Sequence, residues 1–503
     1  MNVYAEQSRS VWMGPPAFAA DALDRNVSAD VLVIGSGIAG LSCAYELALA
    51  GRQVTIIDRG PIARGMSART SAHLSYEFDD YYHELIRLHG EAEARQYCQS
   101  QRAAVDRIEE ICEKEGIDCD FARVDGFLCA ASSTDRSLLE AEMQACHRIG
   151  FEAVQWVRSP LGDLPALHFR QQARFHPVKY LDRLAEVIAA RNGTFYANSP
   201  VVNIDEGREG VRVTIDNGAQ ILAAAVIVAS NSPISNTVAV HTKQAPYRTY
   251  VVAAAVPKGT APDALIWDTN DPYHYVRLQP RQADDLLIIG GEDHKSGTTD
   301  DGVERAARLH AWARDRWPKL GAIEYAWSGQ VYEPVDAVPY IGKAPGMERG
   351  FIVTGDSGEG LTTGVAASLI LRELVMGRES PWSGVYDPGR KSLRSIGTYV
   401  HENLDVAANL TEHVHDSHQL KSLDDVPADA GAIVSVDGRK LAAYRDPNGE
   451  LHLRSATCTH VGCIVHWNSF ERCWDCPCHG SQFSIDGEPL AGPAMKPLAL
   501  HHR

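Results

Sequence analysis

The sequence predicts an α/β protein with a nucleotide-binding domain first, an antiparallel sheet in its middle and a small all-β domain last. Residues 31–58 read as a strand, a glycine-rich turn, a helix and a second strand, and residues 350–374 repeat the first three of these elements. Residues 431–453 contain short strand-like segments separated by Asp-Gly and Asn-Gly turns, which are typical of a small antiparallel domain.

The size, composition and charge of the chain exclude several classes of protein. It has 503 residues, 45% of them hydrophobic and 22% charged, which suits a folded protein of roughly three domains at ~150 residues each. Its 48 Lys and Arg against 65 Asp and Glu give a net charge of −17, so we expect no nucleic-acid partner. No apolar run reaches the ~18–20 residues of a membrane span, and no basic segment followed by an apolar one opens the chain. We therefore expect no membrane span and a cytoplasmic location.

Residues 31–58 contain every element of a nucleotide-binding βαβ unit. The apolar run 31–34 leads into a G-x-G-x-x-G at 35–40, a helical stretch stopped by Gly51, a second apolar run at 54–57 and then Asp58. Glycines let the backbone approach a pyrophosphate at the helix N-terminus, and an acid at the end of the second strand suits a ribose diol. The binding candidates here are Gly35, Ser36, Gly37, Ile38, Ala39, Gly40, Asp58 and Arg59. This unit alone does not distinguish FAD from NAD.

Two further segments favour FAD. Residues 66–73 (MSARTSAH) are small and polar, and residues 350–364 (GFIVTGDSGEGLTTG) lead from a strand through glycines into a helix. Such a second element brings backbone amides to the far end of an extended dinucleotide. The segment 201–228 adds a hairpin with an Asn217-Gly218 turn. The additional candidates are Ser67, Arg69, Thr70, Ser71, Ala72, Val202, Gly355, Asp356, Gly358, Gly360, Leu361 and Thr362.

These segments resemble the D-amino-acid oxidase and glycine oxidase type of FAD-dependent oxidoreductase over roughly residues 28–380. The resemblance rests on VIGSGIAG, IID, the stretch 66–73 and VTGDSGEGLTTG. It implies a Rossmann-like FAD-binding domain, in parts at about 28–110, 195–235 and 335–380. It also implies an antiparallel substrate sheet, in parts at about 111–194 and 236–334, with expected strands at 247–256, 273–277 and 286–291. No second G-x-G-x-x-G follows a strand, so we expect FAD to be reduced by an organic substrate.

A cysteine and histidine pattern marks the C-terminal part. Residues 458–463 read CTHVGC and residues 476–481 read CPCHGS. Two thiolates and two imidazoles suit either a tetrahedral zinc ion or a [2Fe–2S] centre. The paired motifs resemble the Rieske [2Fe–2S] family over roughly 418–503. That resemblance implies the cluster ligands Cys458, His460, Cys476 and His479, and a disulfide between Cys463 and Cys478. Expected strands lie at 431–436, 439–444 and 450–453.

The cluster loops depart from high-potential Rieske proteins at one position. Ser481 keeps a hydroxyl that hydrogen-bonds a cluster sulfur in those proteins, but Phe483 stands where they often carry a tyrosine. One hydrogen bond that raises the reduction potential is thus missing, and we expect a lower potential.

The whole chain resembles FAD oxidoreductases that carry an appended Rieske domain. We expect residues 381–417 to form a structured linker between the two parts. The resemblance implies oxidation of a C–N bond in a small amine or amino acid, with electrons relayed one at a time to the cluster and on to an unknown external acceptor. The alternatives are a cluster that serves as a redox sensor or structural element, and a partner component of an oxygenase system.

The catalytic candidates rest on weaker patterns. His73 lies in the stretch expected to border the flavin, although such a histidine often only packs. Tyr275 and Arg277 alternate on an expected strand, where an arginine suits a substrate carboxylate, although a solvated strand face explains them equally well. Glu292 and His294 follow another expected strand. The acidic pairs Asp79-Asp80 and Asp300-Asp301 are most simply solvated loop charges.

Overall fold

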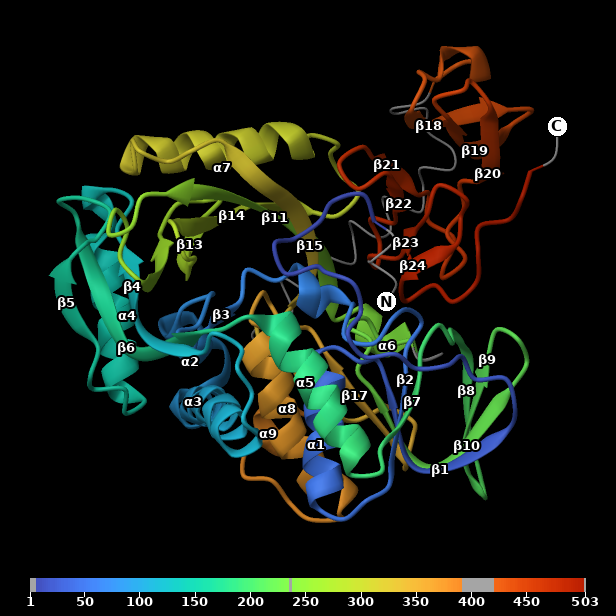
Figure 1. Ribbon diagram of the computed structural model, residues 1–503, viewed down its shortest axis with the longest axis horizontal. Helices are drawn as coiled ribbons and strands as arrows, with labels where there is room; N and C mark the ends of the chain where they lie inside the picture. Colours follow the sequence, from blue (N-terminus) through green and yellow to red (C-terminus); the bar gives the residue numbers. More distant parts are fainter. Residues whose placement is uncertain (1–5, 235–237, 391–419, 502–503) are drawn as a thin grey trace.

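The computed structural model describes residues 6–234, 238–390 and 420–501, which form two large sheets and a C-terminal β-domain (Figure 1). The chain passes between the two large sheets several times, so neither sheet is a continuous stretch of sequence. The C-terminal β-domain lies beside the edge of the second sheet that carries β11 and β15 (Figure 1).

The first sheet is the predicted nucleotide-binding sheet, with a parallel centre in the order β17-β10-β1-β2-β7. Its strands are β1 (Val27–Ile34), β2 (Val54–Ile57), β7 (Thr194–Tyr196), β8 (Val201–Gly207), β9 (Gly210–Ile215), β10 (Gln220–Val228), β16 (Tyr340–Lys343) and β17 (Gly350–Thr354). The Asn217-Gly218 turn joins β9 to β10 as an antiparallel hairpin, as predicted, with Gly218 at φ +88°. The carboxyl ends of β1, β10 and β17 meet at one edge, where ligands bind in open α/β sheets.

Helices cover this sheet and extend beside the second one. They are α1 (Ile38–Leu49), α2 (Tyr82–His89), α3 (Glu91–Glu115), α4 (Arg136–Arg148), α5 (Pro177–Ala190), α6 (Val238–His241), α7 (Gly302–Arg316), α8 (Gly360–Val375) and α9 (Ser383–Tyr386). Helices α1, α5 and α8 pack together, as Figure 1 shows. Helix α5 therefore belongs with the nucleotide-binding sheet, although we expected residues 111–194 to build the substrate sheet.

The second sheet has nine strands and is mostly antiparallel. They are β3 (His73–Leu74), β4 (Ala122–Cys129), β5 (Gln155–Arg158), β6 (Pro165–Arg174), β11 (Gln244–Val256), β12 (Ala264–Asp268), β13 (His274–Pro280), β14 (Asp285–Lys295) and β15 (Ile323–Pro334). The expected strands at 247–256, 273–277 and 286–291 are parts of β11, β13 and β14. Helix α7 packs across β11 and β14 (Figure 1).

The C-terminal domain is all β, as predicted. Its strands are β18 (Ala430–Val436), β19 (Arg439–Arg445), β20 (Leu451–Ser455), β21 (His466–Asn468), β22 (Cys473–Asp475), β23 (Gln482–Phe483) and β24 (Pro489–Ala491). They form two small antiparallel sheets, β18-β19-β20 and β21-β22-β23-β24. Of the predicted linker 381–417, residues 391–417 lie outside the described part of the chain. Among the described helices, none has the length and apolar character needed to cross a membrane.

Candidate functional site

A long cavity begins at the glycine turn between β1 and α1. Gly35 has φ +106°, and a Cβ there would lie 2.3 Å from the carbonyl oxygen of Ala229. A Cβ on Gly40 would lie 1.8 Å from the carbonyl oxygen of Gly35, so this glycine packs α1 against the turn. The turn thus brings bare backbone to the cavity at a helix N-terminus, which fits a pyrophosphate.

The acid at the end of β2 holds this turn in place. One oxygen of the Asp58 carboxylate accepts hydrogen bonds from the Ser36 amide (2.7 Å) and hydroxyl (2.6 Å), and the other accepts from the Gly60 amide (3.0 Å). Asp58 is buried and lines the cavity, as an acid for a ribose would.

Most of the predicted cofactor-binding residues line this one cavity. They are Gly35, Ser36, Gly37, Ile38, Ala39, Asp58, Ser67, Arg69, Thr70, Ser71, Asp356, Gly358, Gly360, Leu361 and Thr362. The cavity therefore joins the glycine turn after β1, the 66–73 stretch and the distant turn before α8, as the resemblance to FAD-binding proteins implies.

Five predicted cofactor-binding residues do not line it: Gly40, Arg59, Ala72, Val202 and Gly355. The guanidinium of Arg59 donates to the carbonyl of Pro489 in the C-terminal domain (3.2 Å). Val202 lies on β8, which reaches β1 only through β9 and β10. Gly355 forms the turn after β17 at φ +73°.

Arg69 lines the cavity, but its guanidinium is bound elsewhere. Its Nε lies 2.7 Å from Glu6, and its Nη2 lies 3.1 Å from Glu471 in the C-terminal domain. All three side chains are buried. Arg69 therefore connects the cavity wall to the docked domain, and its charge is already neutralised.

Aromatic side chains and His73 surround the far end of the cavity. Trp267, Tyr273 and Tyr275 line it, and the His73 ring lies edge-on to Tyr275 with 5.5 Å between centroids. The His73 Nδ1 hydrogen-bonds the Ser71 hydroxyl (2.9 Å), and burial, with the charge of Arg277, lowers the pKa of His73 to about 3. The imidazole is therefore neutral at physiological pH.

Four carboxylates also line this far end: Glu77, Asp79, Asp293 and Glu359. We call them the four cavity carboxylates. Burial, with the charges of Asp80 and Asp293, raises the pKa of Asp79 to about 8, and burial raises the pKa of Asp293 to about 7. Burial raises the pKa of Glu77 and of Glu359 well above the usual range, and the charge of Asp79 adds to both shifts. Groups that raise one another's pKa in this way lie close together.

Asp79 was expected to be a solvated loop charge, and that expectation was wrong. Its carboxylate lines the cavity and accepts a hydrogen bond from the Tyr273 hydroxyl (3.0 Å). Its neighbour Asp80 is exposed, as is Asp300, whose carboxylate accepts from the backbone amide and hydroxyl of Ser469 (both 2.7 Å). The sequence signal for Asp79 was its place just after the 66–73 stretch.

Arg277 does not reach the cavity. Its Nη1 donates to the carbonyls of Ala72 (2.8 Å) and Phe175 (3.1 Å), its Nη2 donates to Gln279, and Trp12 covers the guanidinium at 5.3 Å. Arg277 and Tyr275 do share a face of β13, as predicted, but the N-terminal segment occupies the Arg277 end of that face. The structure thus places no substrate-binding guanidinium here.

Glu292 and His294 also point away from the cavity, because a bulge interrupts β14. The pairing of β11 with β14 shifts between Arg248 and Tyr250, and Gly291 and Glu292 have φ of +136° and +58°. An extra residue in a strand reverses the alternation of its side chains. Asp293 therefore faces the cavity, and the Glu292 carboxylate lies 2.8 Å from Arg308 on α7.

The His294 imidazole lies 3.1 Å from the Tyr250 hydroxyl. The Gly290-Gly291 pair was the sequence signal for this bulge.

The predicted cluster ligands come together on the two C-terminal loops. The rings of His460 and His479 lie 5.0 Å apart, and the thiols of Cys458 and Cys476 contact each other. Burial lowers the pKa of both imidazoles to about 4, so both are neutral. Neither ring nitrogen of His479 has a hydrogen-bond partner among the described residues, although both are buried. Two thiols and two neutral, unsatisfied imidazoles fit a metal cluster.

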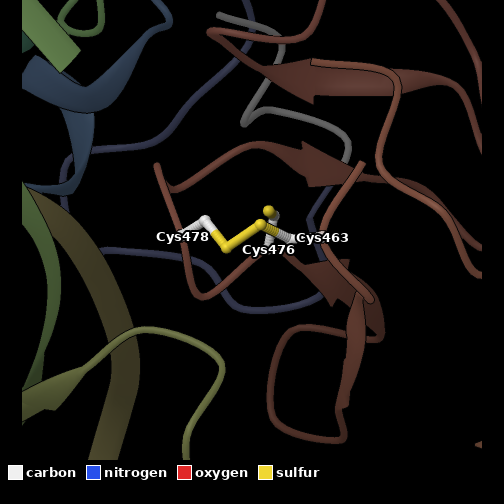
Figure 2. A group of neighbouring side chains, drawn as sticks. All are labelled: Cys463, Cys476 and Cys478. Carbon is white, nitrogen blue, oxygen red and sulfur yellow. A yellow bond between two sulfur atoms is a disulfide. The ribbon is translucent and has the colours of Figure 1, made fainter. Parts of the chain in front are cut away.

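Cys463 and Cys478 form the predicted disulfide between the two cluster loops. Figure 2 shows the Cys476 side chain beside it. The three sulfurs lie within 4.8 Å of one another, but the two in the disulfide are not thiolates and do not act as ligands. Cys458 and Cys476, the two predicted cysteine ligands, are buried free thiols.

The cluster loops dock on the same sheet that lines the cavity. Gln330 of β15 lines the cavity and donates through its amide to the Gly480 carbonyl (2.8 Å). Tyr332 of β15 donates to the His479 carbonyl (3.4 Å), and the His241 ring lies 4.9 Å from that of His460. The loop that carries His479 therefore contacts β15, the strand whose Gln330 also lines the cavity.

Comparison with known proteins identifies both parts. The family model described as FAD dependent oxidoreductase matches residues 30–374, which is more than half of the chain. The chain belongs to the FAD dependent oxidoreductase family. The Rieske [2Fe-2S] domain model matches residues 417–502. This oxidoreductase thus uses FAD and a Rieske [2Fe–2S] cluster. The cysteine and histidine motifs therefore belong to an iron–sulfur site and not to a zinc site.

Individual relatives agree with this assignment. This oxidoreductase is 32% identical over 490 residues to the "Putative Rieske 2Fe-2S iron-sulfur protein YhfW" of Bacillus subtilis, covering 96% of this chain and 95% of that protein. It is 25% identical over 377 residues to the gamma-glutamylputrescine oxidoreductase of Escherichia coli, covering 71% of this chain and 86% of that protein. A crystal structure of glycine oxidase from Geobacillus kaustophilus superposes with a TM-score of 0.59 and 20% identity, covering 72% of this chain and 99% of that one.

Proposed function

We propose that the protein oxidises the C–N bond of a small amine or amino acid, and that the electrons leave through the docked Rieske domain to an external acceptor. The observation that carries this proposal is Gln330, which lines the cavity and hydrogen-bonds the cluster loop at Gly480. The names of the E. coli relative and of the glycine oxidase structure support the substrate class.

Each part of the cavity has a role in this proposal. The glycine turn at 35–40 and the N-terminus of α8 would hold the FAD phosphates, with Asp58 beside a ribose. Cys458, His460, Cys476 and His479 would hold the cluster. When bound, FAD supplies two-electron chemistry by accepting a hydride equivalent, and a [2Fe–2S] cluster supplies one-electron chemistry.

The far end of the cavity serves the substrate. An ammonium group loses one proton to a carboxylate, and the adjacent carbon then gives up a hydride equivalent, so that the C–N bond becomes C=N. Asp293 suits the proton acceptor, because burial brings its pKa to about 7. His73 is unprotonated and held by Ser71, so it orients neighbouring groups and carries no charge. Tyr275 stays neutral, because burial raises its pKa above the usual range.

The docking of the C-terminal domain supports an electron path within one molecule. Arg248 of β11 pairs with Asp475 at 3.0 Å, both side chains being almost fully buried, and Arg69 pairs with Glu471. These contacts hold the cluster loops against β11 and β15. We also propose a cytoplasmic location, where the burial of Cys463 and Cys478 shields the disulfide from reductants.

An anaerobic titration tests the proposal. The holoprotein is mixed with amines and amino acids in turn, and flavin absorbance and cluster EPR are recorded together. We expect an active compound to bleach the flavin and to produce the EPR signal of a reduced Rieske cluster. A bleached flavin beside an oxidised cluster that dithionite still reduces would contradict the relay and favour a sensor or structural role.

A further inference from the structure

The far end of the cavity carries a strong charge asymmetry, and this narrows the substrate class within the proposed function. We infer that the substrate is a small organic dication, an aliphatic chain with a second cationic nitrogen besides the amine that is oxidised, and not an amino acid with a free carboxylate. The inference rests on the proposed C–N oxidation and extends it to substrate recognition.

The negative side of the asymmetry is the set of four cavity carboxylates. Asp79 and Glu359 come from segments that meet at the turn after β17, where a Cβ on Gly358 would lie 3.5 Å from the Asp79 carboxylate. Each of the four has its pKa raised by burial and by at least one neighbouring acid. A ligand with two positive charges would relieve both the repulsion and the cost of burial.

Two of these carboxylates keep oxygens that no described residue binds, although Asp293 also has a hydrogen bond from Thr249. Glu77 is only 3% exposed and lines the cavity, and no described residue donates a hydrogen bond to its carboxylate. One oxygen of Asp293 is buried without a hydrogen-bond partner among the described residues. A carboxylate oxygen that is buried without a donor can accept a hydrogen bond from the ammonium group of a ligand.

Basic side chains that could balance these acids are almost absent from the described cavity lining. Among the described residues that line the cavity, only Arg69 and His73 can carry positive charge. The guanidinium of Arg69 is bound by Glu6 and Glu471, and His73 is neutral. A substrate carboxylate would therefore add one more acidic group to the four cavity carboxylates and would find no bidentate partner.

The cavity walls suit the chain between the two nitrogens. Trp267, Tyr273 and Tyr275 line the same end as the carboxylates, and the Tyr273 hydroxyl donates to Asp79. Aromatic faces pack well on methylene groups and attract ammonium ions. A Cβ on Gly290 would lie 2.1 Å from the Tyr275 ring, so this glycine makes room for that wall.

A matched series of ligands tests the inference. The holoprotein is titrated anaerobically with α,ω-diaminoalkanes, with ω-amino acids of equal length in which a carboxylate replaces one ammonium, and with n-alkylamines. Flavin bleaching reports turnover. Calorimetry on protein already reduced with dithionite reports binding without turnover. We expect the best diamine to bind and to bleach at concentrations at least tenfold lower than its matched ω-amino acid and its matched monoamine.

Variants locate the effect in the cavity. Asp79→Asn should raise the half-saturating diamine concentration at least tenfold and that of the monoamine less than threefold, with flavin content and cluster EPR unchanged. Glu77→Gln serves as the second variant if Asp79→Asn does not fold. Asp163→Asn, whose carboxylate is 90% exposed on the loop before β6, is the matched control and should change neither value.

The outcomes separate the inference from the proposed function. If ω-amino acids bind and bleach as well as the diamines, the inference is overturned and C–N oxidation stands. If diamines bind but no compound bleaches a flavin that dithionite reduces, the recognition stands and the proposed function fails. If diamines neither bind nor bleach, the inference is overturned.

Discussion

The cavity and the docking face of the Rieske domain both bury charge, but in opposite ways. At the docking face, the buried acids Glu6, Glu471 and Asp475 each contact a guanidinium. Arg69 lies between Glu6 and Glu471, and Arg248 pairs with Asp475. In the cavity, the four cavity carboxylates face one another and aromatic rings, with no free cation among the described lining residues. Paired charges hold two domains in one arrangement, whereas unpaired charges leave electrostatic free energy that a ligand can recover.

Breaking a docking pair should have the largest effect on stability. Arg248→Ala leaves the Asp475 carboxylate buried beside the cluster loop without its guanidinium, and we expect the free energy of unfolding to fall by about 3–5 kcal/mol. Chemical denaturation of the holoprotein measures this. Arg158→Ala, which breaks an exposed pair with Asp163, should cost less than about 0.5 kcal/mol. Equal effects of the two variants would show that the docking pair does not hold the domain.

Crowding the docking face should have the next largest effect. A Cβ on Gly480 would lie 2.5 Å from the Gln330 amide nitrogen and 2.7 Å from the Tyr332 hydroxyl, and Gly480 has φ +74°. We expect Gly480→Ala to destabilise the protein by about 1–3 kcal/mol and to separate the cluster loop from β15. The loss should appear as slower cluster reduction at an unchanged rate of flavin reduction. A decrease in both rates would instead place Gly480 among the determinants of the cavity itself.

Neutralising a cavity carboxylate should behave differently, because Asp79 has no ion pair with a described residue, and an asparagine oxygen can still accept the hydrogen bond from Tyr273. The pKa of Asp79 is raised to about 8 in the folded protein, so the folded state holds more protons than the unfolded state between about pH 4 and pH 8. Stability from this group is fully present below that window and is lost as the pH rises through it. The unfolding free energy of Asp79→Asn, minus that of the wild type, should thus increase from pH 5 to pH 8. A difference that is independent of pH would contradict the assigned burial of Asp79.

The smallest change in stability, and a clear change in redox behaviour, is expected at Phe483. This side chain is fully buried in the C-terminal domain. Phe483→Tyr offers a hydroxyl to the cluster, and we expect the reduction potential to rise while the unfolding free energy changes by less than about 1 kcal/mol. Redox titration followed by EPR measures the potential. An unchanged or lower potential would mean that the hydroxyl does not reach the cluster.

The two regions also differ in how far the sequence predicts them. The cluster ligands and the disulfide lie in two short motifs. The resemblance of these motifs to the Rieske family implies their chemistry, whereas their spacing alone also suits zinc. The FAD turn at 35–40 is equally local. These parts of the site were predicted residue by residue, and the structure brings them together on the expected loops.

The substrate end could not be predicted in the same way, because it depends on contacts between distant segments. The bulge at Gly291 and Glu292 exchanges the faces of Glu292 and Asp293, and strand alternation alone does not show it. Trp12 covers Arg277 from far away in the sequence. Asp79 becomes a cavity residue only because the turn at Gly358 folds over it. Local pattern indicates which residues are available, and tertiary packing decides which of them face the ligand.

The most direct test of the central claim is a single-turnover experiment under anaerobic conditions. Holoprotein is mixed with a substoichiometric amount of an active substrate, and flavin absorbance and cluster EPR are followed over a tenfold range of protein concentration. The docked arrangement predicts that cluster reduction follows flavin reduction at a rate independent of protein concentration. A rate that scales with protein concentration, or a cluster that stays oxidised after the flavin is reduced, would contradict an electron path within one chain.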